Sequence, residues 1–237
     1  MLQRWHQAHV GRVLPEWSEY NGGRPLLKPA MSNPPVATSL PIFPLNSVLF
    51  PHGKLALRIF EPRYMDMVAR CMQEGTTFGV CLIAEGKEVG AAAVPHKFGT
   101  EARIVDWDMS QPGMLGLTVQ GGRRFRLLDH SIDAQQGILG NILWVEEPAT
   151  PVLTATHKEL LPLMQLVLAD TGEERIPQPH VLGDASWIGY RYAEILPIPP
   201  LARQRLLELE DAELRLTIIL AYLREHQLIK DGKTPAR

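Results

Sequence analysis

The sequence predicts an α+β protein, with a strand-rich first part followed by a helical second part. Between residues 40 and 145, apolar residues alternate or form short runs of strand length, and proline and glycine separate the runs. Beyond residue 153 the apolar residues recur every three or four positions, as on one face of a helix. The chain has 237 residues, of which 45% are hydrophobic, so it can bury a substantial core.

The first two predicted strands lie on either side of a turn at residues 51–53, Pro-His-Gly. Pro41 and Pro44 lie in the first strand, residues 40–45. Because proline has no N–H to donate to a ladder, we expect this strand to be short or to lie at a sheet edge. In the second strand, residues 55–60, leucine and isoleucine alternate with other residues, which is a period of two.

A helix is predicted immediately after the second strand. Pro62 fits the first turn of a helix, where its missing N–H is not needed. One apolar helical face is formed by Tyr64, Met67, Val68, Cys71 and Met72. Gly75 follows this face and is placed to end the helix.

Short apolar segments predict further strands at residues 78–84, 102–107, 114–120, 123–132 and 138–145. Gly121-Gly122 separates two of these segments, and two glycines between strands are typical of a β-hairpin turn. Six or seven short strands with one early helix indicate a small barrel or a sandwich-like sheet.

The pattern changes at residues 146–153, which we interpret as a boundary between the two parts. Thr156 and Glu159 have the spacing of a capping box at a helix start. Pro162 must then kink that helix or mark its real start. Further helix starts are expected at Asp184, Pro199-Pro200 and Asp211.

Five segments resemble the N-terminal domain of Lon-type ATP-dependent proteases, and most closely its short, free-standing bacterial form. The segments are LPIFPLNSVLFPHGKLALRIFEPRYMDMV, FGVCLI, GTEARIVDWD, LTVQGGRRFRLL and LPIPPLARQRLLELEDAELRL. They follow one another in the family's order, and the resemblance covers about residues 40–224.

The resemblance implies a fold and a role. The implied fold is a PUA-like β pseudo-barrel with one inserted helix at residues 40–148, followed by a C-terminal helical bundle at residues 149–228. Residues 1–39 are then an N-terminal tail and linker, and residues 229–237 a C-terminal tail. In Lon proteases this domain helps to recognise protein substrates. The implied partners are therefore unfolded or extended polypeptide segments, with a Lon-type protease as a further candidate.

The activities of full-length Lon proteases are not expected here. The 237 residues leave no room for the ATPase and peptidase domains. The one Walker-like string, Gly232-Lys233-Thr234, has Gln227 where a P-loop needs its first glycine. The sequence also has no G-x-S-x-G nucleophile motif, and none of His52, His96 and His180 has a second histidine or an acid at metal-ligand spacing. His6 and His9 lie three residues apart, but two ligands alone rarely make a metal site. We expect a protein that is not an enzyme, without catalytic residues, metal or cofactor.

Trp107, Met109 and Met114 are the leading candidates for polypeptide binding. They flank a predicted loop at residues 108–113, DMSQPG, where apolar side chains can form an exposed patch. Methionine suits varied partners because its side chain is flexible and polarisable. The alternative is that these side chains fold back on the sheet and belong to its core.

Arg123, Arg124 and Arg126 form the densest basic cluster and carry the alternative function, RNA binding by a PUA-like module. Three arginines in a chain of net charge −2 make a small contact area for phosphates. We therefore favour structural or ion-pairing roles for them, and we do not expect a nucleic-acid partner. Salt separates the two functions, since phosphate contacts weaken steeply as salt rises and apolar contacts do not.

The remaining features indicate a cytoplasmic protein without membrane contact. Cys71 and Cys81 are too few for a disulfide framework, and their positions predict two small buried side chains. No apolar run approaches the roughly 20 residues of a membrane span. Residues 1–30 lack the apolar core of a secretory signal. The oligomeric state is left open by these patterns.

Overall fold

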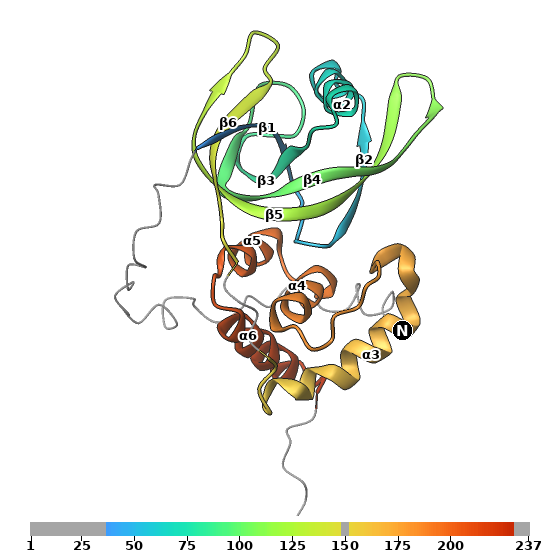
Figure 1. Cartoon of the computed structure of the whole chain (residues 1–237), viewed down its shortest axis with the longest axis vertical. Helices are drawn as coiled ribbons and strands as arrows, with labels where there is room; N and C mark the ends of the chain where they lie inside the picture. The colour runs from blue at the N-terminus through green and yellow to red at the C-terminus, as the bar shows by residue number, and fades with distance from the viewer. Residues whose placement is uncertain (1–36, 148–151, 230–237) are drawn as a thin grey trace, which may run out of the picture. The chain divides into compact units, whose positions relative to one another are not determined.

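The computed structural model describes residues 37–147 and 152–229 (Figure 1). The tail and linker predicted at residues 1–39 lie outside the described residues, except for the last three positions. The Walker-like string at residues 232–234 and all but the first residue of the predicted C-terminal tail also lie outside them.

Strands dominate the first part of the described chain and helices the second, which confirms the predicted α+β class. The strands and their inserted helix are β1 (Thr38–Leu45), β2 (Lys54–Ile59), α2 (Pro62–Glu74), β3 (Phe78–Glu85), β4 (Val94–Gln111), β5 (Met114–Ile132) and β6 (Ile138–Trp144). The later elements are the short 3-10 helix η2 (His157–Leu160), α3 (Leu161–Arg175), α4 (Ala185–Ile195), α5 (Pro200–Glu208) and α6 (Ala212–Glu225). Among the described residues, no helix is long and apolar enough to cross a membrane.

The strands form one sheet that closes on itself. The strand order is β2-β5-β4-β3-β1-β6, and a further pairing between β5 and β6 completes a ring from which β2 is left out (Figure 1). The closure depends on β5, which has 19 residues and takes different partners along its length. Residues 115–120 of β5 pair with β2, and residues 125–132 pair with β6. β2 therefore ends the sheet as an edge strand.

β1 is not the short or edge strand that its prolines predicted. It has eight residues and lies between β3 and β6. Residues 38–42 pair antiparallel with β6, and residues 42–45 pair parallel with β3. Since each half has a partner on one side, Pro41 and Pro44 can turn their hydrogen-free nitrogens to the unpaired side. A strand in the middle of the sheet order can thus tolerate two prolines.

The hairpin predicted at Gly121-Gly122 is wrong, because both glycines lie inside the continuous strand β5. The turn lies instead at Pro112-Gly113, between β4 and β5. Gly113 has a φ of 78°, which is a conformation that favours glycine. The proline before it suits the first central position of such a turn.

Gly121 is required by a close approach of two chain segments. Its N–H donates to the carbonyl of Gly53 and its carbonyl accepts from the N–H of His52, both at 2.8 Å. A Cβ added to Gly121 would collide with the carbonyl oxygen of Phe50. A strand glycine can mark such a contact as well as a turn.

α2 follows β2 directly and covers the main core. Pro62 lies in its first turn, and Gly75 ends it with a left-handed φ of 63°, as predicted. The side chains of Tyr64, Val68 and Cys71 are buried against the sheet. The Tyr64 ring stacks on that of Phe43 in β1, with 4.1 Å between the ring centres.

Two of the predicted helix starts in the second part are confirmed by their caps. The Asp184 carboxylate accepts from the backbone of α4, and the Asp211 carboxylate accepts from the backbone of α6. The capping box predicted at Thr156 and Glu159 is wrong, because the Thr156 side chain makes no cap bond. Thr156 itself has helical backbone angles, whereas a capping residue needs an extended backbone.

Buried polar side chains join the helices to the strand-rich part of the chain. Gln204 of α5 donates to the carbonyl of Phe98 in β4 at 3.0 Å, and Gln204 is fully buried. Arg191 of α4 donates to the carbonyl of Pro51 at 2.5 Å and is also buried. These bonds hold the helical part against the sheet, because a buried carbonyl without a donor is costly.

Candidate functional site

The first candidate surface is the β4–β5 hairpin that ends at Pro112-Gly113, which we call the arm. Trp107 and Met109 are strand residues of β4, and Met114 begins β5, so the predicted loop at residues 108–113 is reduced to a two-residue turn. Trp107 and Met109 are each 54% exposed, and Met114 is half-buried. Val105 is exposed as well. We call Val105, Trp107 and Met109 the arm patch.

The strand register places Trp107 on the same side of the sheet as the core. Residues directly opposite each other in antiparallel strands point to the same side. Leu117 of β5 lies opposite Trp107 on one side and opposite Leu57 of β2 on the other. Leu117 is buried in the main core. The apolar side of the sheet therefore continues outward from Leu117 to Trp107, where solvent reaches it.

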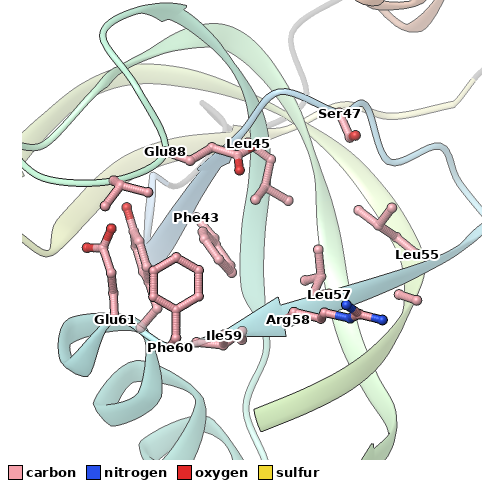
Figure 2. Close-up of a pocket in the computed structure, with 13 residues that line it drawn as sticks. Phe43, Leu45, Ser47, Leu55, Leu57, Arg58, Ile59, Phe60, Glu61 and Glu88 are labelled. Atoms are coloured by element: carbon pink, nitrogen blue, oxygen red, sulfur yellow. The ribbon is translucent and has the colours of Figure 1, made fainter. Parts of the chain in front are cut away.

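The second candidate surface is a groove along β2, at the other end of this row of side chains. Its cavity volume is about 300 Å³. Figure 2 shows side chains from β1 and β2 around the groove. We call it the β2 groove, and its apolar lining is formed by Phe43, Leu45, Leu55, Leu57, Ile59 and Phe60. Phe60 and Val89, which also lines the groove, are both more than half exposed.

Two buried polar atoms at one end of the β2 groove have no hydrogen-bond partner among the described residues. One carboxylate oxygen of Glu61 pairs with Nε of Arg63 at 2.7 Å. The other, Oε1, is buried and has no hydrogen-bond partner among the described residues, and the same holds for the Tyr64 hydroxyl. Burial raises the pKa of Tyr64, although the nearby Arg63 opposes this shift. The hydroxyl stays protonated at neutral pH and can donate or accept a hydrogen bond.

Arg124 of the predicted basic cluster is buried between the strands and the helices. Its Nη1 donates to the carbonyls of Leu207 at 2.5 Å and Leu209 at 3.0 Å, at the end of α5. Its Nε and Nη2 bind the two carboxylate oxygens of Glu147 at 2.5 and 3.0 Å. All three nitrogens are occupied, so this guanidinium is not available to a phosphate.

Arg123 and Arg126 do not form a shared basic surface with Arg124. The Arg123 guanidinium lies over the Trp144 ring, 3.8 Å from its centre, and 3.7 Å from a carboxylate oxygen of Glu101. Arg126 is exposed two residues further along β5. The structure thus presents two of the three side chains to solvent, one of them beside a carboxylate.

The described residues offer little to covalent or metal chemistry. Cys71 and Cys81 are buried, and burial raises the pKa of both thiols. The thiolate is the reactive form, so these thiols are inert at neutral pH. Within residues 37–147 and 152–229, no three histidine, cysteine or acidic side chains gather as metal ligands. The two apolar surfaces can instead hold another chain by burial of apolar side chains.

Sequence reasoning did not find the β2 groove. The alternation in residues 55–60 predicts a strand, but it does not show which side of that strand stays unpaired. That depends on the order of strands far apart in the sequence, such as β2 and β5. One local signal was available: Phe60 is an aromatic residue between a strand and Pro62, at a position that the alternation assigns to the outer face.

A comparison with family models matches residues 39–225 to the ATP-dependent protease La (LON) substrate-binding domain. The curated relatives include Lon protease 2 of Myxococcus xanthus, which is 28% identical over 206 residues. They also include the Lon protease of Anaeromyxobacter dehalogenans strain 2CP-C, which is 28% identical over 207 residues. In both cases the match covers 81% of this chain and 24% of the relative. The chain thus spans about a quarter of the length of these proteases.

Solved structures show the same similarity. A Lon N-terminal domain protein from Xanthomonas campestris is 37% identical with a TM-score of 0.66, and the match covers 78% of this chain and 98% of that one. The N-terminal domain of the Mycobacterium avium complex Lon protease has a TM-score of 0.60 at 16% identity, with 80% and 100% coverage. The second match supports the fold alone.

Proposed function

Because the chain belongs to the LON substrate-binding domain family, we propose that it is a non-catalytic module that binds unfolded or extended polypeptide segments. Binding is passive: exposed apolar side chains of the module cover apolar side chains of the segment. We also propose an adaptor or chaperone role, in which the bound segment passes to a Lon-type protease; the family match and the similarity to Lon proteases support it. No cofactor is needed for this function.

The observation that carries the proposal is the exposure of the arm patch. Trp107 and Met109 are each 54% exposed, although the register of Trp107 continues the row of core residues. Exposed apolar side chains that form a patch on a soluble protein mark interaction sites. Burying one such side chain against a bound segment contributes about 1.5–3 kcal/mol.

RNA binding is not proposed as a second function. The cluster that suggested it loses Arg124 to the contacts with Glu147 and the end of α5. The net charge of −2 adds no general attraction for phosphates.

The experiment measures binding of fluorescein-labelled casein, an unfolded protein, by fluorescence anisotropy. Trp107→Ser combined with Met109→Ser is expected to weaken binding at least tenfold, which corresponds to about 1.4 kcal/mol. The thermal midpoint should stay close to that of the unaltered chain, since both side chains are largely outside the core. Leu166→Ser is the matched control, because Leu166 is also an exposed apolar residue but lies in α3 and not in the arm.

Two results would count against the proposal. Casein that fails to bind the unaltered chain would remove the function itself. Equal binding by the double variant and the Leu166→Ser control, with both proteins folded, would leave the function without the arm patch as its site. A pull-down with the chain as bait, with bound protein and RNA both identified, then decides between a protease partner and a nucleic acid.

A further inference from the structure

We propose that the free edge of β2 binds one extended polypeptide segment as an added β-strand, with alternate side chains of the segment seated in the β2 groove. This inference rests on the proposed function and names the way in which the segment is held. The arm patch and the β2 groove then contact different parts of one bound chain.

β2 is an edge strand whose second side has no strand partner among the described residues. It pairs with β5 over all six of its residues without a register shift. Proteins usually protect such edges with proline, a bulge, inward-pointing charges or a covering segment. β2 contains neither a proline nor a bulge, and its protecting charges are limited to Lys54 and Arg58.

The backbone groups on the free edge can be assigned from the ladder. The N–H of Gly121 donates to the carbonyl of Gly53, one residue before β2. Bonded and non-bonded pairs alternate along an antiparallel ladder. The residues that bond to β5 are therefore Leu55, Leu57 and Ile59. The residues whose N–H and C=O groups face the free edge are Lys54, Ala56 and Arg58.

The groove favours an extended chain over other occupants. Strand side chains alternate between the two faces, so every second side chain of an added strand would lie on the face of Leu55 and Leu57. These two leucines line the β2 groove. Its volume of about 300 Å³ is at the small end for ligand sites and suits one or two apolar side chains. Free backbone groups next to an apolar groove are the features by which strand addition recognises a peptide.

Two buried polar atoms in the groove also point to an occupant. Oε1 of Glu61 and the hydroxyl of Tyr64 are buried without a partner among the described residues, and both residues line the groove. Tyr64 is 4% exposed. A buried polar atom without a hydrogen bond destabilises the protein, because it has lost its bonds to water. A bound segment that supplies an N–H or hydroxyl donor here would remove that cost, which a purely apolar ligand could not do.

The first test compares two substitutions at Ala56. Ala56→Pro removes an N–H that faces the free edge, and it leaves the bonds to β5 intact. Ala56→Val keeps the N–H and adds a side chain similar in size to that of proline. The probe is a fluorescein-labelled peptide in which leucine and serine alternate over ten residues, with lysine at both ends. Ala56→Pro should weaken its binding at least tenfold more than Ala56→Val does.

The peptide supplies a second comparison. A version methylated at every second backbone nitrogen cannot donate hydrogen bonds along one edge, although its side chains are the same. It should bind the unaltered chain at least tenfold more weakly. Equal binding of the two peptides would overturn strand addition, and so would full affinity in a folded Ala56→Pro variant.

Hydrogen exchange keeps the inference testable if Ala56→Pro fails to fold. In the unaltered chain, saturating peptide should slow amide exchange at Ala56 and Arg58 at least tenfold, because both amides become bonded. Unchanged exchange at both would overturn the inference. A dimer in light scattering that the peptide does not dissociate would also overturn it, since a second copy would then occupy the edge.

Casein binding separates this inference from the proposed function. If the unaltered chain does not bind casein, the function itself fails. If it binds casein and the Ala56→Pro variant binds casein and peptide equally well, the function stands and only strand addition fails.

Discussion

Arg123 and Arg124 are neighbours in β5 with opposite surroundings. The Arg124 side chain is fully buried, whereas the Arg123 side chain is 60% exposed. The Arg124 side chain points to the contact with α5, where the backbone carbonyls at the end of the helix need donors. The buried arginine supplies them.

Arg124→Met should therefore destabilise the protein far more than Arg123→Met. Removing Arg124 leaves the carbonyl of Leu207 and part of the Glu147 carboxylate without their donor, at a cost of about 2–3 kcal/mol. Arg123→Met removes an exposed ion pair and a contact with Trp144, together worth about 1 kcal/mol or less. Urea denaturation of both variants measures the difference. Equal losses would show that Arg124 is not a structural link.

Gly121 lies inside strand β5, although the pair Gly121-Gly122 has the composition of a hairpin turn. Gly121→Ala should destabilise by about 1–3 kcal/mol, because the added methyl group collides with the Phe50 carbonyl where two chain segments cross. Gly183→Ala is the matched control, since a Cβ there would meet nothing within 4 Å and should change stability little. Denaturation midpoints test this. A neutral Gly121→Ala would mean that the close approach is not required.

The elements that could be predicted were those whose signals are local. Pro62, Gly75, Asp184 and Asp211 act on the residues next to them, and the structure places each at a helix end as expected. The misread features depend on residues distant in sequence. Gly121 needs its lack of a side chain because of Phe50, about seventy residues earlier, and no local pattern reports that contact.

The candidate site also contains features that have a local sequence signal and features that depend on residues distant in sequence. Trp107 and Met109 could be named because an exposed apolar patch has a local composition, and both are exposed. The β2 groove could not be named, because its walls come from β1, β2 and Val89, and its edge is free only through the strand order. Arg124 could not be assigned a partner either, because Leu207 is 83 positions away.

For the whole molecule, we expect purified protein neither to hydrolyse ATP nor to degrade casein. The Walker-like string lacks its first glycine, and the family match is to a substrate-binding domain. Casein fragmentation on gels and phosphate release are the measurements. A full-length Lon protease serves as the positive control. Activity that stays with the protein through a further purification step would contradict this prediction.

The strands and the helices are expected to unfold together in one cooperative transition. The described residues fall within one compact unit, and buried bonds from Arg124, Arg191 and Gln204 cross between the two parts. Each bond fixes a carbonyl that would lose its partner if one part unfolded alone. Scanning calorimetry should give one peak with equal calorimetric and van't Hoff enthalpies.

Gln204→Leu tests the coupling directly. It keeps the size of the side chain and leaves the Phe98 carbonyl without its donor, at a cost of about 1–2 kcal/mol. At this chain length that loss should lower the midpoint by about 2–8 °C while the single peak remains. If the variant, or the unaltered chain, melts in two peaks, the helical part is an independent domain. Its contacts with the sheet would then contribute little to the stability of either part.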